Sequence, residues 1–111
     1  MTRQQAVEEI TRRLVEFYRP VRIYLFGSEA RGETGPDSDL DFLVVVPDST
    51  PVEILRSGEI FLKLSNIAAA ADVIPWRQSD FEGRAEHVRA SLPATVVREG
   101  RLLYDAARMA A

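Results

Sequence analysis

Three aspartates alternate with other residues at the point where a polar loop runs into an apolar segment. Asp37, Asp39 and Asp41 precede the apolar run at residues 42–46, which is typical of a strand buried on both faces. Because successive side chains on a strand point to opposite faces, Asp39 and Asp41 share a face while Phe42 turns to the core. Two carboxylates about 6–7 Å apart along a strand can each offer an oxygen to one cation.

Such a pair of carboxylates is unfavourable without a counter-charge. Two unit charges ~4 Å apart repel by ~1 kcal/mol in water and by ~4 kcal/mol at an effective dielectric constant near 20. A protein therefore protonates one carboxylate or binds a metal, and an all-oxygen ligand set favours Mg²⁺ or Mn²⁺. Asp72 lies early in another apolar segment. If that segment forms a strand beside the one that carries Asp41, Asp72 completes a cluster of three carboxylates.

A calcium loop is an alternative, because Asp37, Asp39 and Asp41 are spaced like the first ligands of an EF-hand. That loop requires glycine at its sixth position, where this chain has Phe42. Asp37 is better interpreted as a turn residue.

Gly27 and Ser28 follow the apolar run at residues 21–26 and suit a phosphate. Glycine lets a backbone come close to a ligand, and a serine hydroxyl beside the amides of a helix start can bind an anion. Arg31 has two interpretations, a contact with phosphate or partner, or a surface ion pair. A phosphate-binding turn beside metal-binding carboxylates provides the groups that phosphoryl or nucleotidyl transfer requires.

Composition limits the other possibilities. The chain has 111 residues, no cysteine, a net charge of −3 and a pI of about 5.2. These values suit one domain over residues 1–111, exclude disulfides and thiolate metal sites, and argue against a broad basic surface for nucleic acid. No stretch has the ~20 apolar residues that span a bilayer, and the N-terminus lacks a signal-peptide core. We expect a cytoplasmic protein without direct contact to nucleic acid or membrane.

Periodicity predicts strands that alternate with helices. An apolar stripe at helical spacing begins after the N-cap Thr2, Pro75 indicates a strand end or edge, and Gly100 caps a C-terminal helix. Thr50 and Glu53 form a capping box at the start of another helix. We expect helices over residues 2–18, 51–68, 79–90 and 92–99, a helical turn over 28–31, and strands over 21–26, 40–46, 71–76 and 101–104. The predicted fold is α/β (α+β), a small mixed β-sheet with helices mainly on one face.

The run from Leu25 to Val46 resembles a known family. Gly27-Ser28, a gap, and then Asp39-Leu40-Asp41 match the Gly-Ser…Asp-x-Asp signature of the DNA polymerase beta-like nucleotidyltransferases. The fuller run GSEARGETGPDSDLDFLV is similar to the minimal nucleotidyltransferases (MNT) of that superfamily. The resemblance implies that Asp39, Asp41 and Asp72 hold catalytic Mg²⁺, that Asp72 also orients or deprotonates the attacking hydroxyl, and that Ser28 contacts the phosphates of ATP.

The resemblance also implies a partner. Minimal nucleotidyltransferases commonly act beside a small helical toxin with a HEPN domain, so we expect an antitoxin that moves AMP from ATP to a tyrosine of that toxin. We expect the other chain to complete the acceptor site. Two alternatives stay open: an antitoxin that inhibits by binding alone, and a nucleotidyltransferase for small molecules such as an antibiotic.

Overall fold

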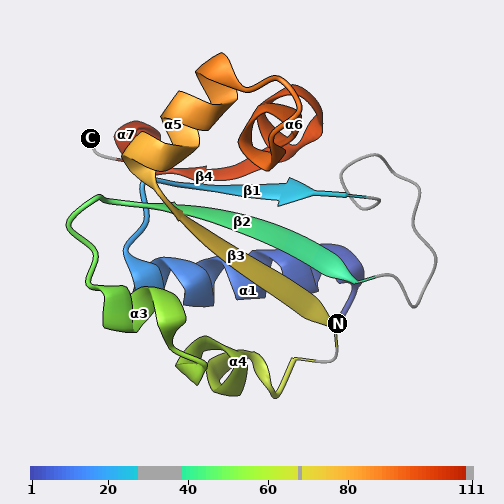
Figure 1. The fold of residues 1–111 in the computed structure, drawn as a ribbon. Helices are drawn as coiled ribbons and strands as arrows, with labels where there is room; N and C mark the ends of the chain where they lie inside the picture. Colours follow the sequence, from blue (N-terminus) through green and yellow to red (C-terminus); the bar gives the residue numbers. More distant parts are fainter. Residues whose placement is uncertain (28–38, 68, 110–111) are drawn as a thin grey trace.

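A four-stranded mixed sheet carries helices on both of its faces (Figure 1). The computed structural model describes residues 1–27, 39–67 and 69–109. The strands are β1 (Arg22–Phe26), β2 (Leu40–Val46), β3 (Ala71–Arg77) and β4 (Arg101–Asp105). The helices are α1 (Arg3–Tyr18), α3 (Val52–Arg56), α4 (Glu59–Leu64), α5 (Gln78–His87), α6 (Leu92–Glu99) and α7 (Ala106–Met109). The predicted mixed α/β fold class is confirmed.

The strand order is β3-β2-β1-β4. β1 pairs antiparallel with both β2 and β4, whereas β2 and β3 run parallel. The predicted carboxylate cluster required the strand of Asp72 to lie beside the strand of Asp41. The strand order confirms that it does. It also makes β3 an edge strand, as Pro75 predicts, because proline donates no hydrogen bond to a neighbouring strand.

The expectation that the helices pack mainly on one face of the sheet is wrong. Phe42 and Val44 of β2 pack in a core with α1 and α4, whereas Leu43 and Val45 point to the other face, where α5 and α6 lie (Figure 1). Strand β2 is therefore buried on both faces, which explains its unbroken apolar run. The helices on each side of the sheet cover every second side chain of β2.

Helix α1 begins as the sequence predicts. The Thr2 hydroxyl accepts from the amide of Gln5 at 3.1 Å, and the Gln5 side chain accepts from the amide of Thr2 at 2.8 Å. This reciprocal pair satisfies two amides that the helix itself leaves without partners. The apolar stripe of α1, with Ile10 and Leu14 fully buried, packs against the sheet.

The single helix predicted over residues 51–68 is wrong. The chain forms two short helices, α3 and α4, separated at Ser57 and Gly58. Ser57 takes an extended conformation at φ −70° and ψ 133°, which no helix interior allows. The capping box is absent as well, since Pro51 is the N-cap of α3 and makes no side-chain bond.

The other helices differ from prediction mainly at their ends. Helix α6 matches the predicted bounds and ends at Gly100. Helix α5 starts one residue before the expected Ser79 and ends at His87 rather than near residue 90. Its Phe81 is buried against Tyr24 of the sheet, with ring centroids 5.6 Å apart, so α5 is fixed to the face that Leu43 and Val45 line. None of the helices in the described ranges is long and apolar enough to cross a bilayer.

Candidate active site

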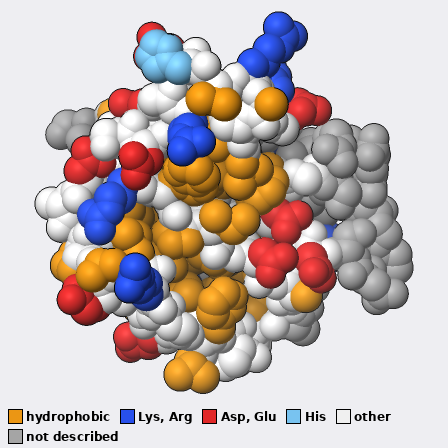
Figure 2. Space-filling model, viewed as in Figure 1, with side chains coloured by type: hydrophobic (Ala, Val, Ile, Leu, Met, Phe, Trp, Pro, Cys, Tyr) orange, Lys and Arg blue, Asp and Glu red, His pale blue; other side chains and the backbone are white. Residues whose placement is uncertain are grey.

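Two of the predicted carboxylates lie side by side on neighbouring strands. Asp41 of β2 is the register partner of Asp72 of β3, and the strands run parallel. Directly paired residues project to the same face, so both carboxylates lie on the α5–α6 side of the sheet. Asp39 immediately precedes β2 and is exposed at the same end of the strand. Figure 2 shows acidic side chains gathered on the surface near the end of the sheet where β2 and β3 begin.

The electrostatics of Asp41 reflect this neighbourhood. Partial burial raises the pKa of the Asp41 carboxyl above its ordinary value, and the charges of Asp72 and Asp39 raise that pKa further. The three carboxylates therefore interact through space, and the negative charge on Asp41 is disfavoured in the metal-free protein. A bound cation would reverse this effect by favouring the charged form.

Gly27 makes room for Asp41. It follows β1 with φ +79°, a conformation that residues with a Cβ rarely adopt. A Cβ atom on Gly27 would lie 2.6 Å from Oδ2 of Asp41, closer than two such atoms can approach. The end of β1 is thus held against a carboxylate of β2 through the pairing of Phe26 with Asp41.

The sequence predicted only that Gly27 lets the backbone approach a phosphate. The role of Gly27 in making room for Asp41 was not predicted. The pattern Gly-Ser after a strand predicts a turn, and nothing in it names the carboxylate that the turn must avoid. The antiparallel register of β1 and β2 decides that contact.

Ser28, Arg31 and Asp37, as well as the helical turn expected over residues 28–31, lie outside the described residues. Their predicted roles stay predictions. Within the described ranges, no group of three or more His, Cys, Asp or Glu is arranged to hold a metal. Asp41 and Asp72 nevertheless fit Mg²⁺, which proteins commonly bind through one or two carboxylates together with phosphates of the substrate.

A groove of about 810 Å³ lies elsewhere, between α1 and α4, and Phe17, Ile54 and Leu62 are among its lining residues. Because α1 and α4 cover one face of the sheet and the carboxylates project from the other, none of the predicted site residues that the structure describes lines this groove. The carboxylate end of the sheet is therefore the better candidate for catalysis, since charge and register both point to it.

The fold and the paired carboxylates define a nucleotidyltransferase, and comparison with known proteins agrees. Residues 7–100 match the model of the nucleotidyltransferase domain family, so the chain belongs to that family. The predicted enzyme class, a nucleotidyltransferase, is confirmed. The likeness to an MNT antitoxin is a likeness of fold. No curated protein matches the chain.

Several solved structures share the fold. A chain from a toxin-antitoxin structure with AMP-PNP is 25% identical, with a TM-score of 0.59 over 88% of this chain and 73% of that one. A chain from a mutant toxin-antitoxin pair, MntA-HpeT, is 21% identical, with a TM-score of 0.60 over 88% of this chain and 71% of that one. A chain from the tri-AMPylated Shewanella oneidensis HEPN toxin in complex with MNT antitoxin is 20% identical, with a TM-score of 0.58 over 97% and 76%.

Proposed function

We propose that residues 1–111 form one nucleotidyltransferase domain that transfers AMP from ATP to a tyrosine hydroxyl of a HEPN-domain toxin and thereby neutralises it. The observation that carries the proposal is the register pairing of Asp41 with Asp72, next to Asp39, on this fold. Support for the partner comes from relatives of the same fold, one of which is an MNT antitoxin in complex with a tri-AMPylated HEPN toxin.

In the proposed reaction, the tyrosine oxygen attacks the α-phosphorus of ATP, and the bond from that phosphorus to the pyrophosphate oxygen breaks. Asp39, Asp41 and Asp72 would hold Mg²⁺, which supplies positive charge for the phosphate oxygens. Asp72 is exposed at the start of β3, so its carboxylate is accessible to the incoming hydroxyl and can orient it or take its proton. The proposal assigns Gly27, Ser28 and Arg31 to the triphosphate.

The site has one open side. Asp72 and Asp39 are exposed, and β3 is an edge strand, so an acceptor carried by a second protein can reach the carboxylates. We therefore propose that the toxin itself supplies the acceptor tyrosine and the remaining wall of the site. ATP is the proposed donor and the cytoplasm the proposed location.

The test is transfer of label from α-labelled ATP to the partner protein encoded beside this chain. We expect label on the partner with Mg²⁺, no label with EDTA, and no label with Asp41→Asn or Asp72→Asn. Asp80→Asn, an exposed carboxylate of α5, is the matched control and should label normally. A folded chain that leaves the partner unlabelled, while still suppressing its toxicity, would replace the transferase proposal with inhibition by binding.

The double variant Asp39→Ala, Asp41→Ala separates the two modes in cells. A transferase with both changes loses the ability to neutralise its partner, whereas a protein that acts by occlusion keeps it. Labelling of a small hydroxylated acceptor without a second protein would favour the small-molecule alternative.

A further inference from the structure

Strand β3 is an edge of the sheet, and half of its backbone groups point away from β2. The amide of Leu40 donates to the carbonyl of Ala70 at 2.9 Å, which fixes the alternation along the parallel pair. Every second residue from Ala70 to Trp76 therefore directs its backbone groups toward β2, and the residues between them direct theirs outward. In the described part of the chain, no backbone hydrogen bond reaches the outward groups of Ala71 and Val73. Free donors and acceptors on an edge strand can pair with a further strand.

Pro75 limits such pairing to the first half of β3. It occupies an outward position and has no amide hydrogen, so a further strand cannot continue past it. The half that stays open contains Ala71 and Val73, with Asp72 between them. The free backbone groups thus lie beside the carboxylates rather than along the whole strand.

The side chains that follow Asp72 on its face of the sheet are apolar. Ile74 and Trp76 stand at alternate positions after Asp72, so they project to the same face, and both are only partly buried. Figure 2 shows apolar side chains across the middle of this side of the molecule, directly beside the acidic group. A bound strand gains affinity from main-chain hydrogen bonds and specificity from contacts of its alternate side chains, and this edge offers both.

These features indicate how the acceptor is held. We propose that the toxin segment that carries the acceptor tyrosine binds as an extended strand along the open half of β3, with the tyrosine paired with Asp72. Directly paired residues project to the same face, and neighbouring strands lie ~4.8 Å apart, so the tyrosine side chain lies beside the carboxylates of Asp72 and Asp41. The toxin residue two positions from the tyrosine then lies against Ile74. This docking rests on the AMP transfer proposed above.

Removal of one outward amide tests the docking. Val73→Pro deletes an outward donor and no hydrogen bond to β2, so the sheet should tolerate it as it tolerates Pro75. In the transfer of label from α-labelled ATP to the partner protein encoded beside this chain, this variant should raise the KM for the partner about tenfold or more. Its affinity for ATP with Mg²⁺, measured by calorimetry without the partner, should equal that of the parent. Val73→Thr keeps the amide and the branched shape, and it should behave as the parent does.

Hydrogen exchange gives a readout that does not depend on catalysis. When the partner binds without ATP, the amides of Ala71 and Val73 should become protected in NMR-detected exchange. The amides of Asp72 and Ile74 already point toward β2 and should not change. Docking through side chains alone would not produce this alternation, and the measurement uses the parent chain, so it decides the question even if Val73→Pro does not fold.

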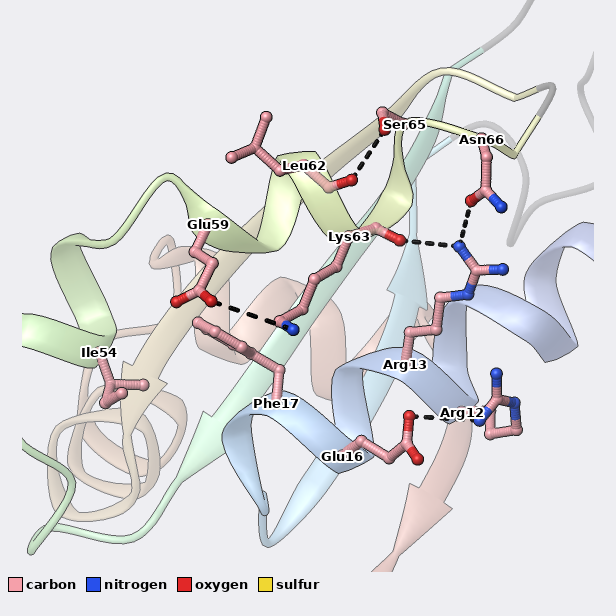
Figure 3. Close-up of a pocket in the computed structure, with 10 residues that line it drawn as sticks. All are labelled: Arg12, Arg13, Glu16, Phe17, Ile54, Glu59, Leu62, Lys63, Ser65 and Asn66. Carbon is pink, nitrogen blue, oxygen red and sulfur yellow. Dashed lines mark hydrogen bonds and ion pairs between the residues drawn. The ribbon is translucent and has the colours of Figure 1, made fainter.

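A second variant tests a different docking surface. Leu62 is 76% exposed on α4 and lines the groove between α1 and α4 (Figure 3). Leu62→Glu should leave the KM for the partner unchanged, and a rise with this variant but not with Val73→Pro would overturn the docking on β3.

Failure of the docking and failure of the transfer give different results. Normal labelling by Val73→Pro with an unchanged KM, or amides of Ala71 and Val73 that stay unprotected, would overturn the docking and leave the transfer intact. A parent chain that never labels its partner would refute the transfer, and the exchange pattern would still decide whether the partner adds a strand to β3.

Discussion

Replacement of Asp41 by asparagine should make the metal-free protein more stable near neutral pH. Asp41 and Asp72 are paired on adjacent strands, and paired strands lie about 4.8 Å apart. Two charges about 5 Å apart repel by ~0.8 kcal/mol in water and by ~3 kcal/mol at an effective dielectric constant of 20. Because Asp72 is exposed and Asp41 is only partly buried, the repulsion is closer to the value in water than to the value at a dielectric constant of 20. We therefore expect Asp41→Asn to raise the free energy of unfolding by about 1 kcal/mol.

The direction of the pH dependence follows from the raised pKa of Asp41. Below the pKa of the unfolded chain, ~3.9, the carboxyl is protonated in both states and no repulsion acts. As the pH rises through the higher pKa of the folded state, the folded protein is increasingly destabilised relative to the unfolded chain. The variant Asp41→Asn should therefore exceed the parent in free energy of unfolding by about 1 kcal/mol at pH ~7.5, and this difference should vanish near pH ~4.

Urea unfolding in EDTA measures this gain, which corresponds to a rise in Tm of about 4 °C for a domain of this size. Asp72→Asn should give a similar gain, and the double variant should gain less than the sum, because the repulsion can be removed only once. Asp80→Asn, in the first turn of α5, should instead lose a few tenths of a kcal/mol. Added Mg²⁺ should stabilise the parent and not Asp41→Asn.

Two results would refute the reasoning. One is an Asp41→Asn variant that is less stable than the parent at neutral pH. The other is a stability difference that stays the same from acidic to neutral pH, because repulsion between ionised carboxylates must disappear when they are protonated.

Three further variants test other parts of the structure. Gly27→Ala should destabilise the fold by about 1–2 kcal/mol in urea unfolding, because its φ is positive and its Cβ meets Asp41; equal stability would contradict that contact. Phe42→Ala should cost about 3–5 kcal/mol, since the side chain is fully buried in the core between the sheet and α1; a loss under about 1 kcal/mol would place it elsewhere. Arg13→Ala should cost about 1 kcal/mol and speed hydrogen exchange in α4, whose carbonyl at Lys63 loses its donor; unchanged exchange would show that α4 does not need it.

The strands of the sheet could be predicted from the sequence, whereas the pairing of their acidic residues was expected only on a condition. Strand β2 was evident because residues 42–46 are apolar without interruption, and β3 was predicted from the apolar segment at residues 71–76. That β3 lies beside β2 and pairs Asp72 with Asp41 is a result of the strand order, which a local pattern does not give. The same uninterrupted run already indicated helices on both faces, so the expectation of one covered face contradicted its own evidence. A strand that is apolar on both sides needs cover on both sides.

Two other errors have different causes. The break between α3 and α4 had a local signal, because Gly58 directly follows Ser57 and both are poor in helix interiors. The absence of the capping box had no local signal in the sequence. Arg77, at the end of β3, donates to the carbonyls of Asp48 and Thr50 at 2.7 and 2.9 Å and fixes the turn in which the box was expected. A contact between residues so far apart in sequence cannot be read from a local pattern.

The parallel pairing of β2 with β3 has a consequence for how the acidic site comes into being. Residues 47–70 must cross over before Asp72 can reach Asp41, and closing this longer loop costs more entropy than pairing β1 with β2 does. A chain still emerging from the ribosome thus carries Asp39 and Asp41 without their companion. Asp72 joins Asp41 only when that crossover has closed.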